Sequence, residues 1–381
     1  MDDFLLTPEQ LDWRDTVRRF VEKSITREYV RECDQNRQYP YEAYRKVAEQ
    51  GWLGLLVPEE HGGGGFDMFA VVLLLQELGR YSVDFGTAFA VPAFTVTNIV
   101  HHGTAEQRER YLPAFVRGEV RFSISITEPE AGSDVAAVST RAVRDDAGFL
   151  INGVKMYSSA AHVENNVICL LARTAAGSTR RDGLSLLLVP ADSPGITMTR
   201  LPTIARRATG TNQVFFDDVR VPHSALLGGL GDGWKLITEH LEFERLTMAA
   251  IYAQNGQQAV ADAIAYATER HQFGRPISKF QVIKHSLAQM QTDADMASLL
   301  VYRATRKLQL GLPSLREVSM ANLMAAELLY KIAGEGMQIL GGAAQLPEAD
   351  MERYWREGKQ AMVGGGTSQI QRSIIAKTLG L

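Results

Sequence analysis

A chain of 381 residues, 45% of them hydrophobic, is long enough for two or three domains with a large buried core, which excludes disorder as its main state. Its 44 acidic and 40 basic residues nearly balance and form no sustained run of one sign, so the charge pattern disfavours nucleic acids and anionic membranes as partners. Two cysteines, Cys33 and Cys169, are too few for a disulfide framework or a zinc site.

The N-terminal segment MDDFLLTPEQ is acidic, whereas a secretion signal or a mitochondrial transit peptide is basic at this position. No apolar run in the sequence reaches the roughly 18 to 20 residues that a membrane-spanning helix needs. We therefore expect a cytoplasmic protein that acts on small molecules and binds neither a membrane nor a nucleic acid.

Helical patterns fill the first third of the chain. Thr7 is a candidate N-cap followed by Pro8, and Gln10 stands three residues after the cap, as in a capping box. Further helices are predicted at residues 41–49, 68–80 and 105–117, with glycine-rich segments between them.

The pattern changes to short β-rich runs between about residues 122 and 227. These runs are RFSISIT, FLINGVKMYSS, VICLLAR, LSLLLVP and VFFDDVRVP, and they are divided by Gly, Pro, Asp and Asn residues. Helical periodicity returns after GGLGDGW and continues to the C-terminus. The order α, β, α predicts a small sheet or barrel between two helical regions.

Several common catalytic motifs are absent from the sequence. The chain has no G-x-G-x-x-G, P-loop, H-E-x-x-H or G-x-S-x-G pattern, so nicotinamide Rossmann, P-loop, zinc-protease and serine-hydrolase interpretations have no residue support. We interpret the adjacent His101 and His102 as a solvated helix end rather than a metal site.

The strongest candidate for a binding loop is the segment ITEPEAGSD at residues 126–134. Its proline favours a turn, its Ala-Gly pair permits close approach of the backbone, and its hydroxyls can donate hydrogen bonds. Such a loop suits a pyrophosphate and can present Thr127 to the edge of a ring. On residue types alone, a turn stabilised by Asp and Ser explains the segment equally well.

The segment ITEPEAGSD resembles the flavin-loop signature of the acyl-CoA dehydrogenase family, and the α, β, α order is similar to the whole-chain plan of that family. The resemblance implies an α+β fold in three parts. These are an N-terminal α-helical domain at residues 1–121, a central β-barrel at 122–228 and a C-terminal four-helix bundle at 229–381. It also implies FAD as the cofactor.

Further segments extend the resemblance to almost the full chain: PEEHGGGG, INGVKMYSSAA, VFFDDVRVP, ERHQFGRPISKFQ, QILGGAAQ and GGTSQIQR. The segment ERHQFGRPISKFQ resembles one that reaches the FAD of a neighbouring subunit, which implies a homotetramer or homodimer with shared FAD sites. Matched position by position, the resemblance places cofactor contacts at Ile124, Ile126, Thr127, Ser133, Tyr157, Ser159, Arg270, Phe273, Gln281, Gln338, Gly342, Thr367 and Gln369. It places substrate contacts at Ser133, Arg245, Gly365 and Gly366.

One position departs from the pattern of most family members. They have a glutamate directly before the Gly-Thr of the last motif, where it removes the α-proton of the acyl thioester, and this chain has Gly365 there. Either the protein has lost this chemistry, or the base comes from another part of the chain.

The segment GWKLITEHLEFERLTMAAIYA contains a candidate base. Ile237, Leu241, Glu244, Met248 and Ile251 fall on one stripe of a helix, with a single carboxylate at its centre. Burial raises the pKa of a carboxyl group and brings a weak base closer to neutral pH. A structural salt bridge or a pair with His240 explains the pattern equally well.

The resemblance favours the base. A subset of the family, including isovaleryl-CoA and long-chain acyl-CoA dehydrogenases, has a small residue at the C-terminal position and its base in a Glu-Arg pair on this helix. Here that pair is Glu244-Arg245. The implied reaction is an α,β-dehydrogenation in which Glu244 takes the α-proton, hydride passes to flavin N5 and the Gly365 N–H supports the thioester carbonyl. An electron-transfer flavoprotein is the implied electron acceptor.

Three other functions fit the same residues. The first is the same chemistry on an acyl or aminoacyl group held by a carrier protein. The second is a flavin oxidase or monooxygenase on the same fold, because a fold does not determine a function. The third is a non-catalytic flavoprotein.

Overall fold

A computed structural model describes residues 5–65, 67–175 and 181–381 of the chain. The chain divides into two compact units that do not follow chain order. The first unit comprises Met1–Gln35, Met68–Thr87 and Arg245–Leu381, and the second comprises Asn36–Asp67 and Ala88–Glu244. Helices α5 (Val83–His102) and α7 (Gly233–Glu269) each contribute residues to both units.

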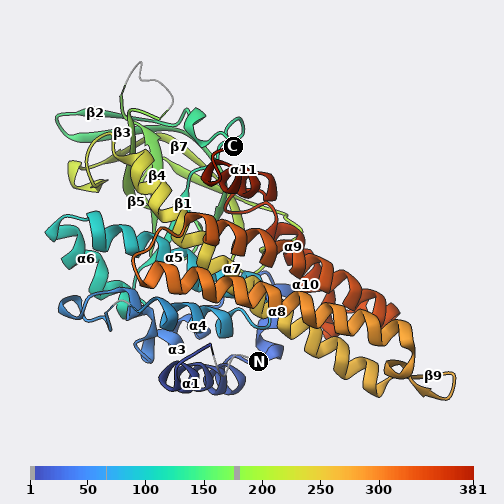
Figure 1. The fold of residues 1–381 in the computed structure, drawn as a ribbon. Coiled ribbons are helices and arrows are strands. Elements are labelled where there is room, and N and C mark those ends of the chain that lie inside the picture. The colour runs from blue at the N-terminus through green and yellow to red at the C-terminus, as the bar shows by residue number, and fades with distance from the viewer. Residues whose placement is uncertain (1–4, 66, 176–180) are drawn as a thin grey trace. The chain divides into compact units, whose positions relative to one another are not determined.

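The first unit is helical. It contains α1 (Pro8–Ser24), α2 (Arg27–Gln35), α4 (Met68–Leu78), α8 (Gln281–Gln309), α9 (Leu315–Leu340), α10 (Met351–Ala361) and α11 (Ser368–Thr378), with the C-terminal part of α7 (Figure 1). Helix α9 packs against α8, α10 and α11. The predicted capping box at the start of α1 is confirmed, because the Thr7 hydroxyl accepts from the Gln10 N–H and the Gln10 side chain accepts from the Thr7 N–H.

The second unit combines helices with one sheet. Its helices are α3 (Tyr41–Glu49), α6 (Ala105–Val116) and the parts of α5 and α7 that belong to it. Its strands are β1 (Arg121–Ser125), β2 (Arg141–Asp145), β3 (Gly148–Ser159), β4 (Asn166–Arg173), β5 (Leu184–Pro190), β6 (Ile196–Leu201), β7 (Thr211–Val221) and β8 (Leu226–Leu227). The order is β6-β7-β3-β2-β4-β5-β8, and β1 pairs in parallel with β4.

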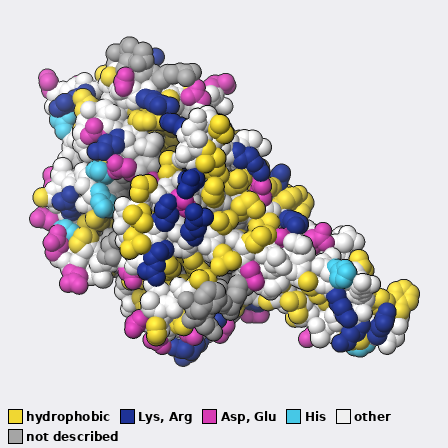
Figure 2. All heavy atoms as spheres, in the orientation of Figure 1, with side chains coloured by type: hydrophobic (Ala, Val, Ile, Leu, Met, Phe, Trp, Pro, Cys, Tyr) yellow, Lys and Arg dark blue, Asp and Glu magenta, His cyan; other side chains and the backbone are white. Residues whose placement is uncertain are grey.

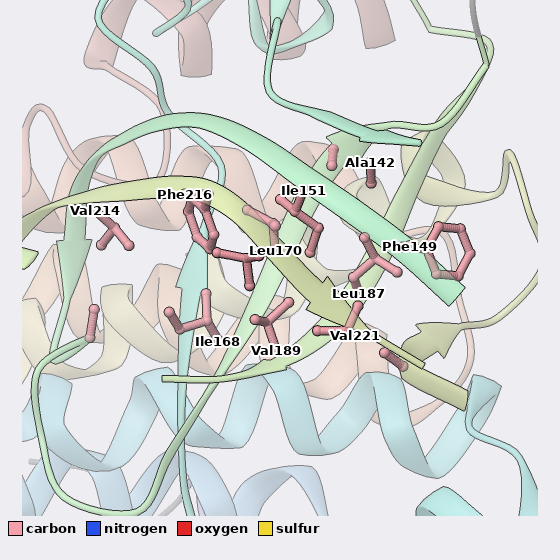
Figure 3. Close-up of a cluster of buried hydrophobic side chains, with 14 residues drawn as sticks. Ala142, Phe149, Ile151, Ile168, Leu170, Leu187, Val189, Val214, Phe216 and Val221 are labelled. Atoms are coloured by element: carbon pink, nitrogen blue, oxygen red, sulfur yellow. The ribbon is translucent and has the colours of Figure 1, made fainter. Parts of the chain in front are cut away.

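The sheet packs around an apolar cluster: β4 and β5 are buried along nearly their whole length, and β7 alternates buried and more exposed side chains over much of its length. In β7, for example, Val214, Phe216, Val219 and Val221 are buried. Figure 3 shows side chains of β3, β4, β5 and β7 pointing toward one another inside this cluster. The expected α+β fold with a β-rich centre is confirmed, and the predicted helix at residues 41–49 matches α3.

The prediction that no apolar segment is long enough to span a membrane was wrong for α5. This helix has 20 residues and a mean hydropathy of 1.3, which meet the length and composition of a span. However, 89% of the most apolar 18-residue stretch of this helix is buried inside the protein, as in the core helix of a globular domain. The sequence pattern did not reveal it because Pro92 and several polar residues interrupt the apolar run.

A long hairpin ends the helical unit. Helix α7 has 37 residues, and the short strands β9 (His271–Gln272) and β10 (Arg275–Pro276) connect it to α8. The ring of Phe273 at the turn is 93% exposed. Figure 1 shows the hairpin at the far tip of the helical unit, and Figure 2 shows basic and hydrophobic side chains gathered there.

Candidate active site

The second unit presents the segment ITEPEAGSD directly after β1. Ile124 is half-buried within the strand, and Ile126 and Thr127 are half-buried just beyond it. The backbone then makes a tight turn, because Glu128 N–H donates to Ala131 O at 3.0 Å and Ala131 N–H donates to Glu128 O at 3.1 Å.

A buried ion pair holds this loop against β3. The Lys155 ammonium is fully buried and donates to Glu128 Oε1 at 2.8 Å and to the Ile126 carbonyl at 2.9 Å. Glu128 also accepts from the Ser139 N–H at 2.7 Å, the Ser139 hydroxyl at 2.8 Å and the Thr140 N–H at 2.9 Å. Both sides of the pair are therefore well supplied with hydrogen bonds, which a buried charge requires.

The pair is ionised near neutral pH. Burial alone would raise the pKa of Glu128, but the Lys155 charge and the hydrogen bonds outweigh it and lower the pKa to about 2. Burial lowers the pKa of Lys155 to about 8 against the opposing effect of Glu128.

A bulge in β3 joins the same loop to the predicted flavin-facing residues. The pairing of β3 with β7 shifts register between Lys155 and Ser158, and in this interval the Met156 N–H donates to Thr127 O at 2.8 Å. Tyr157 has a φ of +59° and is 60% exposed. A non-glycine residue with positive φ is strained, and such strain is concentrated at functional sites. Ser159 follows and is half-buried.

The backbone after the turn is open to a ligand. Gly132 and Ser133 are exposed, and a Cβ built on Gly132 would have no atom within 4 Å. Among the described residues, the N–H groups of Gly132 and Ser133 have no hydrogen-bond acceptor. Free N–H groups beside a serine hydroxyl suit the phosphates of a dinucleotide, and an exposed aromatic side chain suits its ring. These residues therefore fit FAD.

Glu244 lies where the sequence predicts, on a largely buried stripe of α7. Ile237, Met248 and Ile251 on this stripe are buried, and Glu244 itself is half-buried. The Asn98 amide nitrogen donates to His240 Nδ1 at 2.6 Å. Burial lowers the pKa of His240 to about 3, so this histidine is neutral at pH 7 and cannot be the cationic partner of Glu244.

The first unit holds the predicted C-terminal motif in a tight turn between α10 and α11. Gly365 and Gly366 have φ values of +67° and +101°, which favour glycine. The Thr367 hydroxyl then caps α11 by accepting from the Ile370 N–H at 3.2 Å. The structure brings the predicted residue Arg245 to this turn, where its Nε donates to the Gly365 carbonyl at 3.3 Å.

The backbone at Gly365 leads to a stability prediction. Gly365→Ala should destabilise the apoprotein by about 1–2 kcal/mol, because a side chain is strained at positive φ. Thermal unfolding of the apoprotein measures the effect. Gly342→Ala is the control, since Gly342 has no positive φ and no atom within 4 Å of an added Cβ. Equal Tm values for the two variants would contradict the prediction.

The remaining predicted cofactor positions are exposed on the first unit. Gln338 and Gly342 lie at the end of α9 and in the turn after it, and Gln369 lies on α11. The structure does not bring Arg270, Phe273 and Gln281 to the glycine turn. They lie on or beside the hairpin, at the opposite end of the helical unit from α11 (Figure 1).

Sequence reasoning missed three residues that support these segments: Glu128, Lys155 and Gln371. Glu128 and Lys155 stand inside quoted motifs, but nothing in their spacing shows that they pair. Gln371 is fully buried, and its amide nitrogen donates to Gly365 O at 3.3 Å and to Gly366 O at 3.1 Å. Over the residues that the structure describes, no cluster of three or more His, Cys, Asp or Glu side chains is arranged to hold a metal ion.

Comparison with known families matches almost the whole chain in three consecutive parts. Residues 7–119 match the N-terminal domain of acyl-CoA dehydrogenase, residues 123–219 its middle domain and residues 231–380 its C-terminal domain.

Individual relatives agree over their full lengths. A probable acyl-CoA dehydrogenase, YngJ, of Bacillus subtilis (strain 168) is 34% identical over 99% of both chains. The caffeyl-CoA reductase-Etf complex subunit CarC of Acetobacterium woodii is 31% identical over 96% of this chain and 97% of that protein. The crystal structure of the prolyl acyl carrier protein oxidase AnaB superposes with a TM-score of 0.93 at 27% identity, over 99% of this chain and 100% of that one.

The chain matches three domains of one family in their usual order, and its full-length relatives include proteins more than 30% identical to it. Both findings assign the chain to the same family. The chain belongs to the acyl-CoA dehydrogenase family, whose members are FAD-dependent oxidoreductases that act on CH–CH bonds.

Proposed function

We propose that this protein catalyses α,β-dehydrogenation of an acyl thioester, most simply an acyl-CoA, with Glu244 as the base. The observation that carries the proposal is the glycine turn. Gly365 replaces the glutamate of most family members and has a φ of +67°, whereas Glu244 supplies a half-buried carboxylate on an otherwise apolar stripe of α7. This exchange supports the proposal that the protein resembles the isovaleryl-CoA and long-chain acyl-CoA subset of the family.

The residues that would hold FAD in the second unit follow from the contacts described above. Thr127 and Ser159 supply hydroxyl groups, Tyr157 supplies an exposed ring, and Ser133 with its free N–H suits the diphosphate. In the first unit, Thr367, Gln369, Gln338 and Gly342 are the proposed contacts. Bound FAD supplies the acceptor for the hydride that leaves the β-carbon.

The chain itself performs the proton chemistry. Glu244 takes the α-proton as the general base. The Gly365 N–H has no acceptor among the described residues, so it is available to donate to the thioester carbonyl as negative charge develops there. A backbone donor of this kind does not depend on the side chain at position 365.

The absence of a side chain at Gly365 also bears on the substrate. Glycine leaves space beside the α- and β-carbons of the acyl group that a glutamate would fill. We therefore expect branched or cyclic acyl groups to be accepted.

We also propose how the protein meets its partners. The exposed hairpin with Arg270, Phe273 and Gln281 is suited to complete the FAD site of a second copy, in a homotetramer or homodimer. The reduced flavin would pass its electrons to an electron-transfer flavoprotein. CarC is itself named as part of an Etf complex, which supports this acceptor.

One alternative has a specific observation in its favour. AnaB is named as a prolyl acyl carrier protein oxidase, so a carrier-bound aminoacyl group is a second candidate substrate and oxygen a second candidate acceptor. A carrier protein and CoA present the same phosphopantetheine thioester.

The test is anaerobic stopped-flow absorbance of the purified FAD-loaded protein. The panel contains straight, branched and cyclic acyl-CoAs and the same groups on a carrier protein. Rapid bleaching of the flavin by a thioester supports the proposal, and the fastest substrate identifies the carrier and the acyl class. Failure of every thioester to bleach the flavin would leave the non-catalytic function, and peroxide formation in air would favour the oxidase.

A further inference from the structure

Gln371 lies in the first turn of α11, and its amide faces the backbone of the glycine turn. The side chain is fully buried. Its amide nitrogen donates to the carbonyl oxygens of Gly365 at 3.3 Å and of Gly366 at 3.1 Å. Only the NH₂ end of an amide can donate to two carbonyl oxygens, so the chemistry fixes which end of Gln371 faces the turn.

A second donor reaches one of the same carbonyls. Arg245 Nε donates to Gly365 O at 3.3 Å, and Arg245 is itself anchored, because Asn322 Nδ2 donates to its backbone carbonyl at 3.0 Å. The carbonyl of Gly365 is thus held by side chains of two helices, α7 and α11. We name Arg245 and Gln371 the carbonyl clamp.

The carbonyl clamp matters because glycine does not restrict its own backbone. Three consecutive glycines, Gly364 to Gly366, can adopt many φ and ψ combinations. Contacts with other residues must therefore restrict the backbone at each of them. A peptide unit is planar, so holding the Gly365 oxygen also fixes the direction of the Gly366 N–H on the other side of the same unit. Among the described residues, the N–H groups of Gly365 and Gly366 have no acceptor.

We propose that Gln371 is a positioning residue for catalysis: by clamping the Gly365 carbonyl it directs the free Gly366 N–H of the same peptide unit at the thioester carbonyl, beside the Gly365 N–H. The inference rests on the proposed function. A donor contributes to an enolate-like transition state only when it already points at the oxygen, because no reorganisation is then needed as charge develops. The amide of Gln371 thus acts through the backbone and does not touch the substrate.

Two variants test the assignment. Gln371→Leu removes both donated hydrogen bonds at similar volume, and Gln371→Glu keeps the shape but replaces the donor with an acceptor that faces two carbonyls. The control is Gln309→Leu, the same exchange at an exposed glutamine at the end of α8.

Two measurements separate positioning from simple stability. The first is the rate constant of anaerobic flavin reduction by the fastest thioester, at saturating substrate. The second uses a thioester analogue with sulfur at position 3, which can lose its α-proton but cannot donate hydride. The bound enolate of this analogue absorbs at long wavelength together with the flavin. The pH at which this absorbance is half-maximal reports how well the protein stabilises the enolate.

We expect Gln371→Leu to bind FAD with an unchanged spectrum and to unfold near the wild-type Tm, whereas Gln371→Glu, which buries a carboxyl group against two carbonyl oxygens, should unfold at a lower temperature. Flavin reduction should slow by about 10- to 100-fold, below the effect of deleting a direct donor. The pH midpoint with the analogue should rise by about one unit, the equivalent of a tenfold weaker stabilisation. The Gln309 control should match the wild type.

Three outcomes overturn the inference. The first is a Gln371→Leu variant whose flavin-reduction rate constant and pH midpoint equal those of a wild type that thioesters reduce. In that case the carbonyl clamp does not serve catalysis, but the proposed function stands. Loss of FAD or of several degrees of Tm in both variants assigns Gln371 to stability alone. A wild-type protein that no thioester reduces overturns the proposed function, and this inference with it.

Discussion

Glu244→Gln should slow anaerobic reduction of the bound flavin by an acyl thioester by about 10²- to 10⁴-fold, the usual contribution of a general base. Glutamine has nearly the same shape but cannot accept the α-proton. The substrate should still bind, because the amide preserves the volume and most of the polarity of the side chain. Stopped-flow absorbance at several substrate concentrations separates the reduction rate constant from the apparent dissociation constant.

Two neighbouring glutamates provide the controls for this experiment. Glu239 is exposed, and its Oε2 lies 2.8 Å from His102 Nε2. Glu242 lies off the apolar stripe. Glu239→Gln and Glu242→Gln should reduce the flavin at close to the wild-type rate. If Glu244→Gln is as fast as the wild type while these controls are unaffected, the carboxylate on α7 is structural and the base lies elsewhere.

Lys155→Met should destabilise the folded protein by about 3–5 kcal/mol, because it leaves Glu128 buried without its counter-charge. The same change removes the hydrogen bond from Lys155 to the Ile126 carbonyl. The loop that carries Ile126 and Thr127 should loosen, and FAD should bind more weakly. Chemical unfolding of the apoprotein and flavin fluorescence on titration with FAD measure the two effects separately.

A double variant tests the cause of this loss. Lys155→Met combined with Glu128→Gln removes both charges, so it should recover part of the stability that the single change loses. The exposed pair between Arg220 and Asp145, 2.8 Å apart in the same unit, is the matched control, and Arg220→Met should have little effect. Equal losses of unfolding free energy in Lys155→Met and Arg220→Met would contradict the prediction that burial makes the Lys155–Glu128 pair more important for stability than an exposed pair.

Local signals in the sequence were sufficient for four helices of the N-terminal third, α1, α3, α4 and α6. A hydroxyl, a proline and a glutamine at fixed offsets predicted the start of α1 at Pro8, because capping depends only on neighbouring residues. Helix α3 was predicted at its observed residues without a capping signal, from its helical pattern and the glycine-rich segment that follows it. Helix α5 was missed because its residues are buried on most sides, which removes the amphipathic period that identifies a surface helix.

The site could be predicted only where a motif carries its own chemistry. Thr127, Tyr157 and Gly365 were proposed as site residues because the segments around them resemble those of a known family. Glu128 and Lys155 could not be paired from the sequence, since their contact depends on how the loop after β1 meets the bulge in β3. Gln371 has the polarity of a surface residue, and only the turn before α11 directs its amide inward.

The left-handed backbone at Gly365 has an evolutionary consequence. A change from glycine to glutamate at this position would put a side chain on a backbone conformation that favours glycine, at a cost of about 1–2 kcal/mol. The turn would have to be reshaped before a base there became useful. With Glu244 as the proposed base, a carboxylate at position 365 would bring no catalytic gain that offsets this cost. Descendants of such a protein are expected to diversify their acyl groups around the vacant position rather than refill it.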